Sequence, residues 1–159
     1  MGNTLNFKTL NIILICNILT GNISFAQIPL SKQATLIESV SSSEVMIEAT
    51  GIYNGVGRKD KHKKKDVEKN GMARATLDAK KSAVYFVLFG STDPLLSSTQ
   101  EQQIFGSHEA FFFNNDNVSN YITYEDVQVI KKVKIDGGKG LKLVKRFKVN
   151  KELLTKDLE

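Results

Sequence analysis

The chain has 159 residues, 41% of them hydrophobic, and its 22 Lys and Arg against 17 Asp and Glu give a net charge of +5. This modest positive balance suits contact with anionic partners such as phospholipid head groups, lipopolysaccharide or acidic protein faces, and it suits ordinary solubility equally well. Trp is absent, and the Phe residues lie in apolar runs rather than alternating with cations as base-stacking platforms do, which argues against nucleic acid as a partner.

Residues 1–26 are typical of a secretory signal peptide. The single cation Lys8 precedes a mostly apolar stretch, residues 10–19, and the small residues Ser24 and Ala26 stand at the −3 and −1 positions of a cleavage site. A permanent transmembrane helix needs about 20 apolar residues, and polar residues interrupt this stretch. We therefore predict cleavage after Ala26 and export to the periplasm or to the outside of the cell.

Cys16 raises the alternative of a bacterial lipoprotein, which is cut just before a lipidated cysteine. That reaction needs a small residue before the cysteine, and Ile15 is bulky and β-branched, so an outer-membrane lipoprotein is the less favoured prediction. Cleavage after Ala26 removes one lysine and the only cysteine, and it leaves 133 residues with a net charge of +4. Such a chain forms no disulfide, so its core must stabilise a single domain by itself.

The segment that follows, residues 27–43, is predicted to be a linker with at most a short helical turn, because it is polar and contains a run of serines. Residues 44–53 alternate apolar and polar side chains, which predicts the first strand of a domain that spans residues 44–159. Glycines then interrupt the pattern. The basic residues 58–65 (RKDKHKKK) are predicted to be an exposed loop because of their many like charges.

A long helix is predicted within residues 66–89, because small and apolar residues recur there at helical spacing. Three alanines on this face would let the helix lie close on a sheet, whereas Lys80 and Lys81 are predicted to point to water. A short helix is also predicted around residues 100–105. The residues on the packing face of the long helix are Met72, Ala75, Ala79, Ala83 and Phe86.

A β-hairpin is predicted around the glycine-rich turn at residues 136–140. A register in which Ile135 faces Leu141 brings the apolar faces of the two arms together. That register also sets Lys131 opposite Lys145, so we expect either a bulge or exposure of both amines to solvent. The apolar faces are Val127, Val129, Val133 and Ile135 on the first arm, and Leu141, Leu143, Phe147 and Val149 on the second.

After the hairpin, a short amphipathic helix is predicted to begin beyond Asn150. The elements together predict an α+β fold. It is a small, mainly antiparallel sheet with a long helix packed on one face and a C-terminal β-hairpin.

A strand, a glycine break and a helix with small residues at fixed positions form a recognisable order. The helix positions are Ala73-Arg74, Asp78-Ala79 and Ala83. With residues 119–130 and 141–150, this order resembles the N-terminal domain of the flagellar assembly protein T family and the related LPP-type surface lipoproteins. The resemblance covers about residues 44–155.

This resemblance implies a compact domain with a helix packed on a small antiparallel sheet. It also implies an envelope component that binds other proteins and is not an enzyme. The chain departs from the family in its poorly placed Cys16, in its basic residues 58–65, and in ending soon after the hairpin. A role in a flagellar ring is therefore not inferred.

Two basic surfaces are candidates for binding an envelope protein or an anionic membrane or glycolipid surface. Near a charged membrane each cation contributes about 1 kcal/mol, although both surfaces also fit the simpler interpretation of solvated charges. The first surface consists of Arg58, Lys59, Lys61, His62, Lys63, Lys64 and Lys65. The second lies on the hairpin, opposite its apolar face, and consists of Lys132, Lys134, Lys142, Arg146 and Lys148.

Patterns that carry catalytic, cofactor or metal chemistry are weak. His62 and His108 lack the tight spacing of metal ligands, and the glycines after the first strand do not match a phosphate-binding loop. We therefore predict a non-enzymatic envelope domain without cofactor or metal. A small periplasmic hydrolase is the alternative from another class, and it would require a pocket in which His108 meets carboxylates. A stand-alone module of a larger envelope assembly is a third interpretation.

Overall fold

The computed structural model describes residues 28–159, except for the side chains of residues 100 and 104. The predicted signal peptide and Cys16 lie outside the described residues. The fold is α+β, as predicted: a curled antiparallel sheet of five strands with a long helix on one face. The strands are β1 (Ala34–Ser39), β2 (Glu44–Asn54), β3 (Ile122–Glu125), β4 (Lys131–Ile135) and β5 (Gly140–Asn150).

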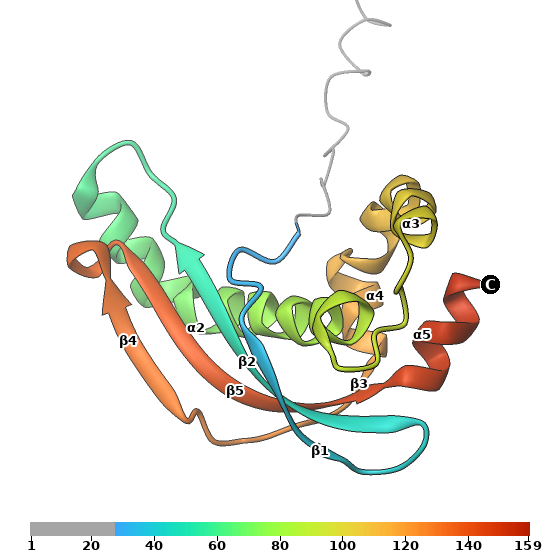
Figure 1. Ribbon diagram of the computed structural model, residues 1–159. Coiled ribbons are helices and arrows are strands. Elements are labelled where there is room, and N and C mark those ends of the chain that lie inside the picture. Colours follow the sequence, from blue (N-terminus) through green and yellow to red (C-terminus); the bar gives the residue numbers. More distant parts are fainter. Residues whose placement is uncertain (1–27) are drawn as a thin grey trace, which may run out of the picture.

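The two long strands, β2 and β5, pair along their whole length and form the centre of the sheet. β1 flanks β2, while β3 and β4 share the other edge of β5. Figure 1 shows the sheet curling beneath α2, with α3, α4 and α5 gathered at the end where β5 runs into α5. The helices are α2 (Asp60–Tyr85), α3 (Thr99–Phe112), α4 (Asn115–Asn120) and α5 (Lys151–Leu158).

The predicted alanine stripe positions α2 on the sheet. Ala75, Ala79 and Ala83 have no exposed surface, which confirms that prediction. Gly51 of β2 lies directly beneath them, and a Cβ added there would be 1.8 Å from the carbonyl oxygen of Ala75. Small residues on both elements therefore permit backbone-to-backbone approach. Met72 was wrongly assigned to this face, since it is 40% exposed.

The predicted linker is wrong for residues 34–39, which form β1 on the edge of the sheet. The serine run does not extend the chain but closes the β1–β2 turn, where the Ser41 hydroxyl oxygen accepts a hydrogen bond from the backbone N–H of Glu44 at 3.0 Å. The register of β1 shifts between Leu36 and Glu38. This bulge interrupts the two-residue alternation by which a strand is recognised in a sequence.

The basic residues were predicted to be a loop, but α2 begins at Asp60 and includes Lys61 to Lys65. Lysine is a good helix former, and its long side chain reaches solvent from any helical position on this projecting end. The predicted exposure is confirmed for all of these residues except Lys63, which is half-buried. Like charges therefore did not prevent helix formation.

The hairpin pairs in a register one residue away from the predicted one, with Ile135 opposite Gly140 and Lys131 opposite Val144. The expected irregularity lies in residues 126–130, which separate β3 from β4 and leave Lys145 paired with Ala49 of β2 but without a directly paired residue on the β3–β4 side. The second-arm prediction is confirmed, because Leu141, Leu143, Phe147 and Val149 are all buried. On the first arm, Val127 and Val133 are exposed. Residues 126–130 thus decide the register and separate the two lysines.

The predicted C-terminal helix is confirmed as α5. Asn150 precedes it, and its side-chain oxygen accepts a hydrogen bond from the backbone N–H of Leu153 at 2.9 Å. Within residues 28–159, no helix has both the length and the apolar character needed to cross a membrane.

Candidate functional site

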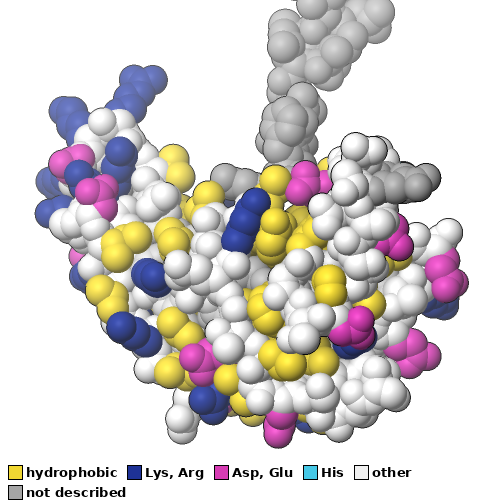
Figure 2. All heavy atoms as spheres, viewed as in Figure 1, with side chains coloured by type: hydrophobic (Ala, Val, Ile, Leu, Met, Phe, Trp, Pro, Cys, Tyr) yellow, Lys and Arg dark blue, Asp and Glu magenta, His cyan; other side chains and the backbone are white. Residues whose placement is uncertain are grey.

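The start of α2 and the residues before it form a projecting positive surface, which we call the cationic arm (residues 58–65). It carries six Lys or Arg and one carboxylate, that of Asp60. The tip of the β4–β5 hairpin lies beside it, since the backbone N–H of Gly55 donates to the Lys139 carbonyl at 2.8 Å and the Lys139 amine lies 3.5 Å from the Asp60 carboxylate. Figure 2 shows the dark blue side chains crowded at this end.

The charge of the arm is poorly compensated. Among the described residues, no salt bridge joins an arm lysine to a carboxylate. Asp66, one turn further along α2, accepts hydrogen bonds from the Tyr53 hydroxyl, the Val56 backbone and the Asn70 amide, at 2.6, 2.8 and 2.6 Å. The bond from Tyr53 is the main cause that lowers the pKa of Asp66. This carboxylate thus anchors the loop before the arm by bonds to neutral donors.

A helix N-terminus already carries partial positive charge, so lysines there reduce the stability of α2. The N-cap residue, Lys59, makes no side-chain capping hydrogen bond that would offset this. The arm therefore combines repulsion between like charges, exposure of the lysine side chains to solvent, and an unfavourable interaction of these charges with the dipole of α2. Each of these three properties would become favourable if an anion were bound.

The second predicted surface does not form one face. Lys132 and Lys134 pair with Leu143 and Leu141, so they lie on the helix-covered face of the sheet, beyond the area that α2 covers. The predicted shared face is wrong because the register differs by one residue, and a one-residue shift moves every side chain of β4 to the opposite face.

On the open face of the sheet, Lys142, Arg146 and Lys148 each have a partner within the chain. The Lys142 amine donates to the Gln33 side chain at 3.2 Å, and the Arg146 guanidinium lies 3.2 Å from the Glu48 carboxylate. The Lys148 amine lies over a Tyr124 ring at 5.7 Å. These contacts make the hairpin a weaker docking candidate than the cationic arm.

A buried carboxylate fastens the N-terminal segment to the rest of the fold. Asp78 on α2 accepts hydrogen bonds from the backbone N–H groups of Leu30 and Ile52, both at 2.8 Å, where β1 no longer pairs with β2. Burial raises the pKa of Asp78, against the opposing effect of these N–H groups. Its neighbour Lys81 is also buried, which corrects the prediction that it points to water. Burial lowers the pKa of Lys81.

Asp78 and Lys81 line a cavity of about 350 Å³, and the sequence interpretation missed it because residues 28–33 were taken as part of a linker. Since the Asp78 carboxylate is occupied by backbone donors, the cavity is best explained as part of the attachment of this segment. The other lining residues are Ile28, Leu30, Ile52, Tyr53, Val56, Arg74, Leu77 and Asn115.

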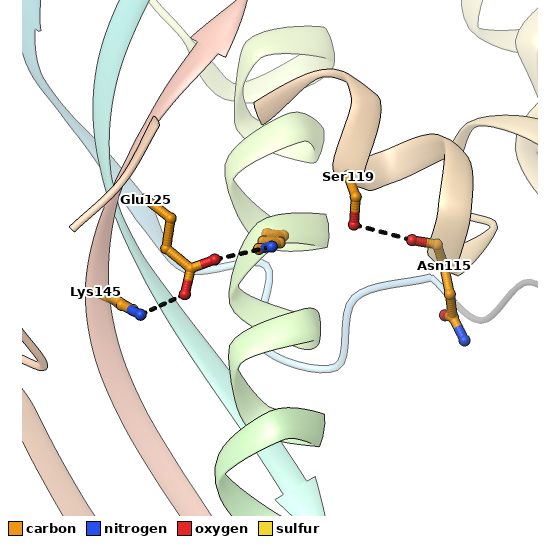
Figure 3. Close-up of polar contacts among 5 residues, drawn as sticks. Asn115, Ser119, Glu125 and Lys145 are labelled. Carbon is orange, nitrogen blue, oxygen red and sulfur yellow. Dashed lines mark hydrogen bonds and ion pairs between the residues drawn. The ribbon is translucent and has the colours of Figure 1, made fainter. Parts of the chain in front are cut away.

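A second polar network joins α2 to the irregular edge of the sheet. Glu125 lies between two amines, with Lys80 at 2.8 Å and Lys145 in direct hydrogen-bonding contact (Figure 3). Burial tends to raise the pKa of Glu125, but the hydrogen bonds from Lys145 and Lys80 outweigh it, so the pKa is lowered. The same view shows α4 nearby, where Ser119 donates to the carbonyl of Asn115 at 3.1 Å. The network explains why Lys145 is tolerated on the core face.

A groove of about 530 Å³ lies between α3 and α5. Its base includes Phe112, whose ring stacks on Tyr121 at 6.0 Å, and the Tyr121 hydroxyl donates to Asp157 of α5 at 2.8 Å. His108 lines the same hollow as the carboxylates of Glu101, Asp157 and Glu159. The lining residues are Leu95, Leu96, Glu101, Phe105, His108, Phe112, Thr155, Asp157, Leu158 and Glu159.

The two histidines considered as metal ligands lie on different helices, His62 on α2 and His108 on α3. In the described part of the chain, no three His, Cys, Asp or Glu side chains are grouped so that they could hold a metal ion.

Comparisons of this chain with protein-family models, with curated proteins and with solved structures found no match. The resemblance to the flagellar assembly protein T family therefore stays a prediction. Function has to be inferred from the cationic arm and the groove.

Proposed function

We propose that the protein is an exported, non-enzymatic cell-envelope domain that docks on an anionic membrane surface through its cationic arm. The observation that carries this proposal is the concentration of six cations at an exposed helix start with one carboxylate among them. Export rests on the predicted signal peptide.

The energetics favour a lipid surface over a shaped protein pocket. The arm is a set of long, exposed side chains without a groove, and such chains adapt to head groups whose positions vary. Each cation near an anionic bilayer contributes about 1 kcal/mol, so the arm supplies enough free energy for reversible attachment. The unfavourable charge at the start of α2 is relieved in the same step.

The test is co-sedimentation of the mature chain (residues 27–159), without the apolar signal segment, with vesicles that contain phosphatidylglycerol, compared with vesicles of phosphatidylcholine alone. We expect binding to the anionic vesicles only, and we expect it to weaken as salt rises, because exposed charges are screened. The variant K61E/K64E/K65E should lose at least about 100-fold in affinity, since three contributions of about 1 kcal/mol are removed and repulsion is added.

A matched control places the same charge change on β4, in K131E/K132E/K134E, where all three lysines are exposed. We expect this control to lose far less affinity than the arm variant. Equal losses in the two variants would show that net charge, and not the arm, drives binding. Equal binding to both vesicle types would contradict the proposal.

The groove supports the second candidate, a small hydrolase, because it collects His108 with Glu101, Asp157 and Glu159. A His and carboxylates supply the groups needed for general acid–base chemistry. Turnover of chromogenic ester and peptide substrates, abolished by His108→Ala, would establish this alternative. Turnover that persists in His108→Ala would exclude the groove histidine from the reaction.

A further inference from the structure

The end of the molecule opposite the cationic arm has the reverse charge character. Residues 82–130, which include α3, α4 and β3, contain no Lys or Arg. Figure 2 shows magenta side chains around α3 and α5. The carboxylates of this stretch are Asp93, Glu101, Glu109, Asp116, Glu125 and Asp126.

The groove between α3 and α5 lies at this end and combines an apolar base with an acidic rim. Leu95, Leu96, Phe105, Phe112 and Leu158 supply the apolar surface. The carboxylates of Glu101, Asp157 and Glu159 line the same hollow. Its volume of about 530 Å³ falls within the usual range of ligand sites, which is roughly 300–1,000 Å³.

Two of the rim carboxylates are held in fixed positions. Glu101 closes a capping box at the start of α3, where it accepts a hydrogen bond from the backbone N–H of Ser98 at 2.8 Å. Asp157 accepts the Tyr121 hydroxyl, and Tyr121 in turn stacks on Phe112. One aromatic residue thus joins both walls of the groove, so the charges are arranged before any ligand arrives.

We infer that this groove docks a basic amphipathic peptide segment of a partner protein. The apolar side chains of the segment cover the base of the groove, and its Lys or Arg side chains reach the carboxylates on the rim. An amphipathic helix laid in a groove between two helices is a common mode of peptide recognition. The inference is independent of membrane docking, because it concerns the opposite end and the opposite charge.

Charge complementarity decides between possible occupants. An anionic ligand would meet three carboxylates in this groove, and no Lys or Arg is among the described residues that line it. A neutral apolar ligand would leave the rim charges unused. A basic segment satisfies both the apolar base and the rim.

The test uses two synthetic peptides of about 14 residues with Leu on one helical face, one with Lys and the other with Glu at the remaining positions. Isothermal titration with the mature chain (residues 27–159) should show the Lys peptide binding at least about tenfold tighter than the Glu peptide, a difference of about 1.4 kcal/mol. Amide chemical-shift changes on adding the Lys peptide should fall on α3 and α5.

The variant E101Q/D157N/E159Q removes the three rim charges, while the amide side chains that replace Glu101 and Asp157 still offer an oxygen to Ser98 and Tyr121. It should weaken binding of the Lys peptide at least about tenfold. The matched control E109Q/D116N/E152Q removes three charges from the same end outside the groove, and it should change affinity by less than about twofold. Circular dichroism of both variants checks that they fold.

Several outcomes would overturn the inference. Equal binding of the two peptides, or equal weakening in the rim variant and the control, would show that the rim does not select charge. Shift changes outside α3 and α5 would place the peptide elsewhere. Concentration-dependent dimerisation that the rim variant abolishes would make a second copy of this chain the occupant instead.

Discussion

The two ends of this molecule differ in how their charges are held. At the arm, lysines project into solvent without carboxylate partners, and their charges oppose the dipole of their own helix. At the groove, Glu101 and Asp157 are fixed by hydrogen bonds, and Glu101 lies where the dipole of α3 favours a negative charge. An adaptable charged surface suits a fluid, variable target such as a bilayer, whereas a fixed one suits a shaped peptide.

Both ends depend on the same central packing of α2 on β2, and Gly51→Ala should have the largest effect of any change that we predict. The added Cβ would overlap the backbone of α2 at Ala75, so we expect a loss of more than about 4 kcal/mol or failure to fold. Chemical denaturation measures the loss.

Gly106→Ala is the matched control at the groove end. Nothing lies within 4 Å of a Cβ added at Gly106 on α3, so alanine should stabilise the helix by about 1 kcal/mol. If Gly51→Ala lost no more unfolding free energy than a surface substitution does, the close approach of the β2 and α2 backbones would be contradicted.

The Glu125 network joins β3 to α2 through Lys80 and to β5 through Lys145. Breaking it should have an intermediate effect on stability. Glu125→Ala leaves the mostly buried Lys145 without its carboxylate, so we expect a loss of about 2–4 kcal/mol in thermal or urea unfolding. Glu48→Ala breaks the more exposed pair with Arg146 and should cost at most about 1 kcal/mol. Equal losses would show that burial of the network contributes nothing.

The same network predicts a pH dependence. The folded-state pKa of Glu125 is lowered, so its contribution is complete above its unfolded pKa of about 4.3 and is lost as pH falls through the folded value. Glu125→Gln should therefore lose less stability between about pH 7 and about pH 3 than the unaltered protein. Parallel stability curves for the two proteins would contradict this assignment.

The smallest effect on stability is expected from charge reversal in the cationic arm. In K61E/K64E/K65E, acidic residues replace lysines in the first turns of α2, where they interact favourably with the dipole. We expect a gain of about 1 kcal/mol in unfolding free energy, together with the loss of vesicle binding. A variant that loses both stability and binding would show that the lysines support the fold.

Much of the framework follows from local patterns. The alternation in β2 and β5, the alanine stripe of α2 and the helix beyond Asn150 were all predictable, because each depends on neighbours within a few residues. The exposure of residues 58–65 followed from their charge. Their helical conformation did not, because lysine is compatible with both states.

Tertiary structure alone decided the edges of the sheet and the groove. β1 was missed because its bulge breaks the alternation, and the β4 register was wrong because residues 126–130 leave the strand. The burial of Lys81 and Lys145 and the groove between α3 and α5 depend on residues far apart in the chain, as in the pairing of Tyr121 with Asp157. A sequence pattern reports the preference of each segment, but contacts between distant segments determine which charges are buried and where a hollow forms.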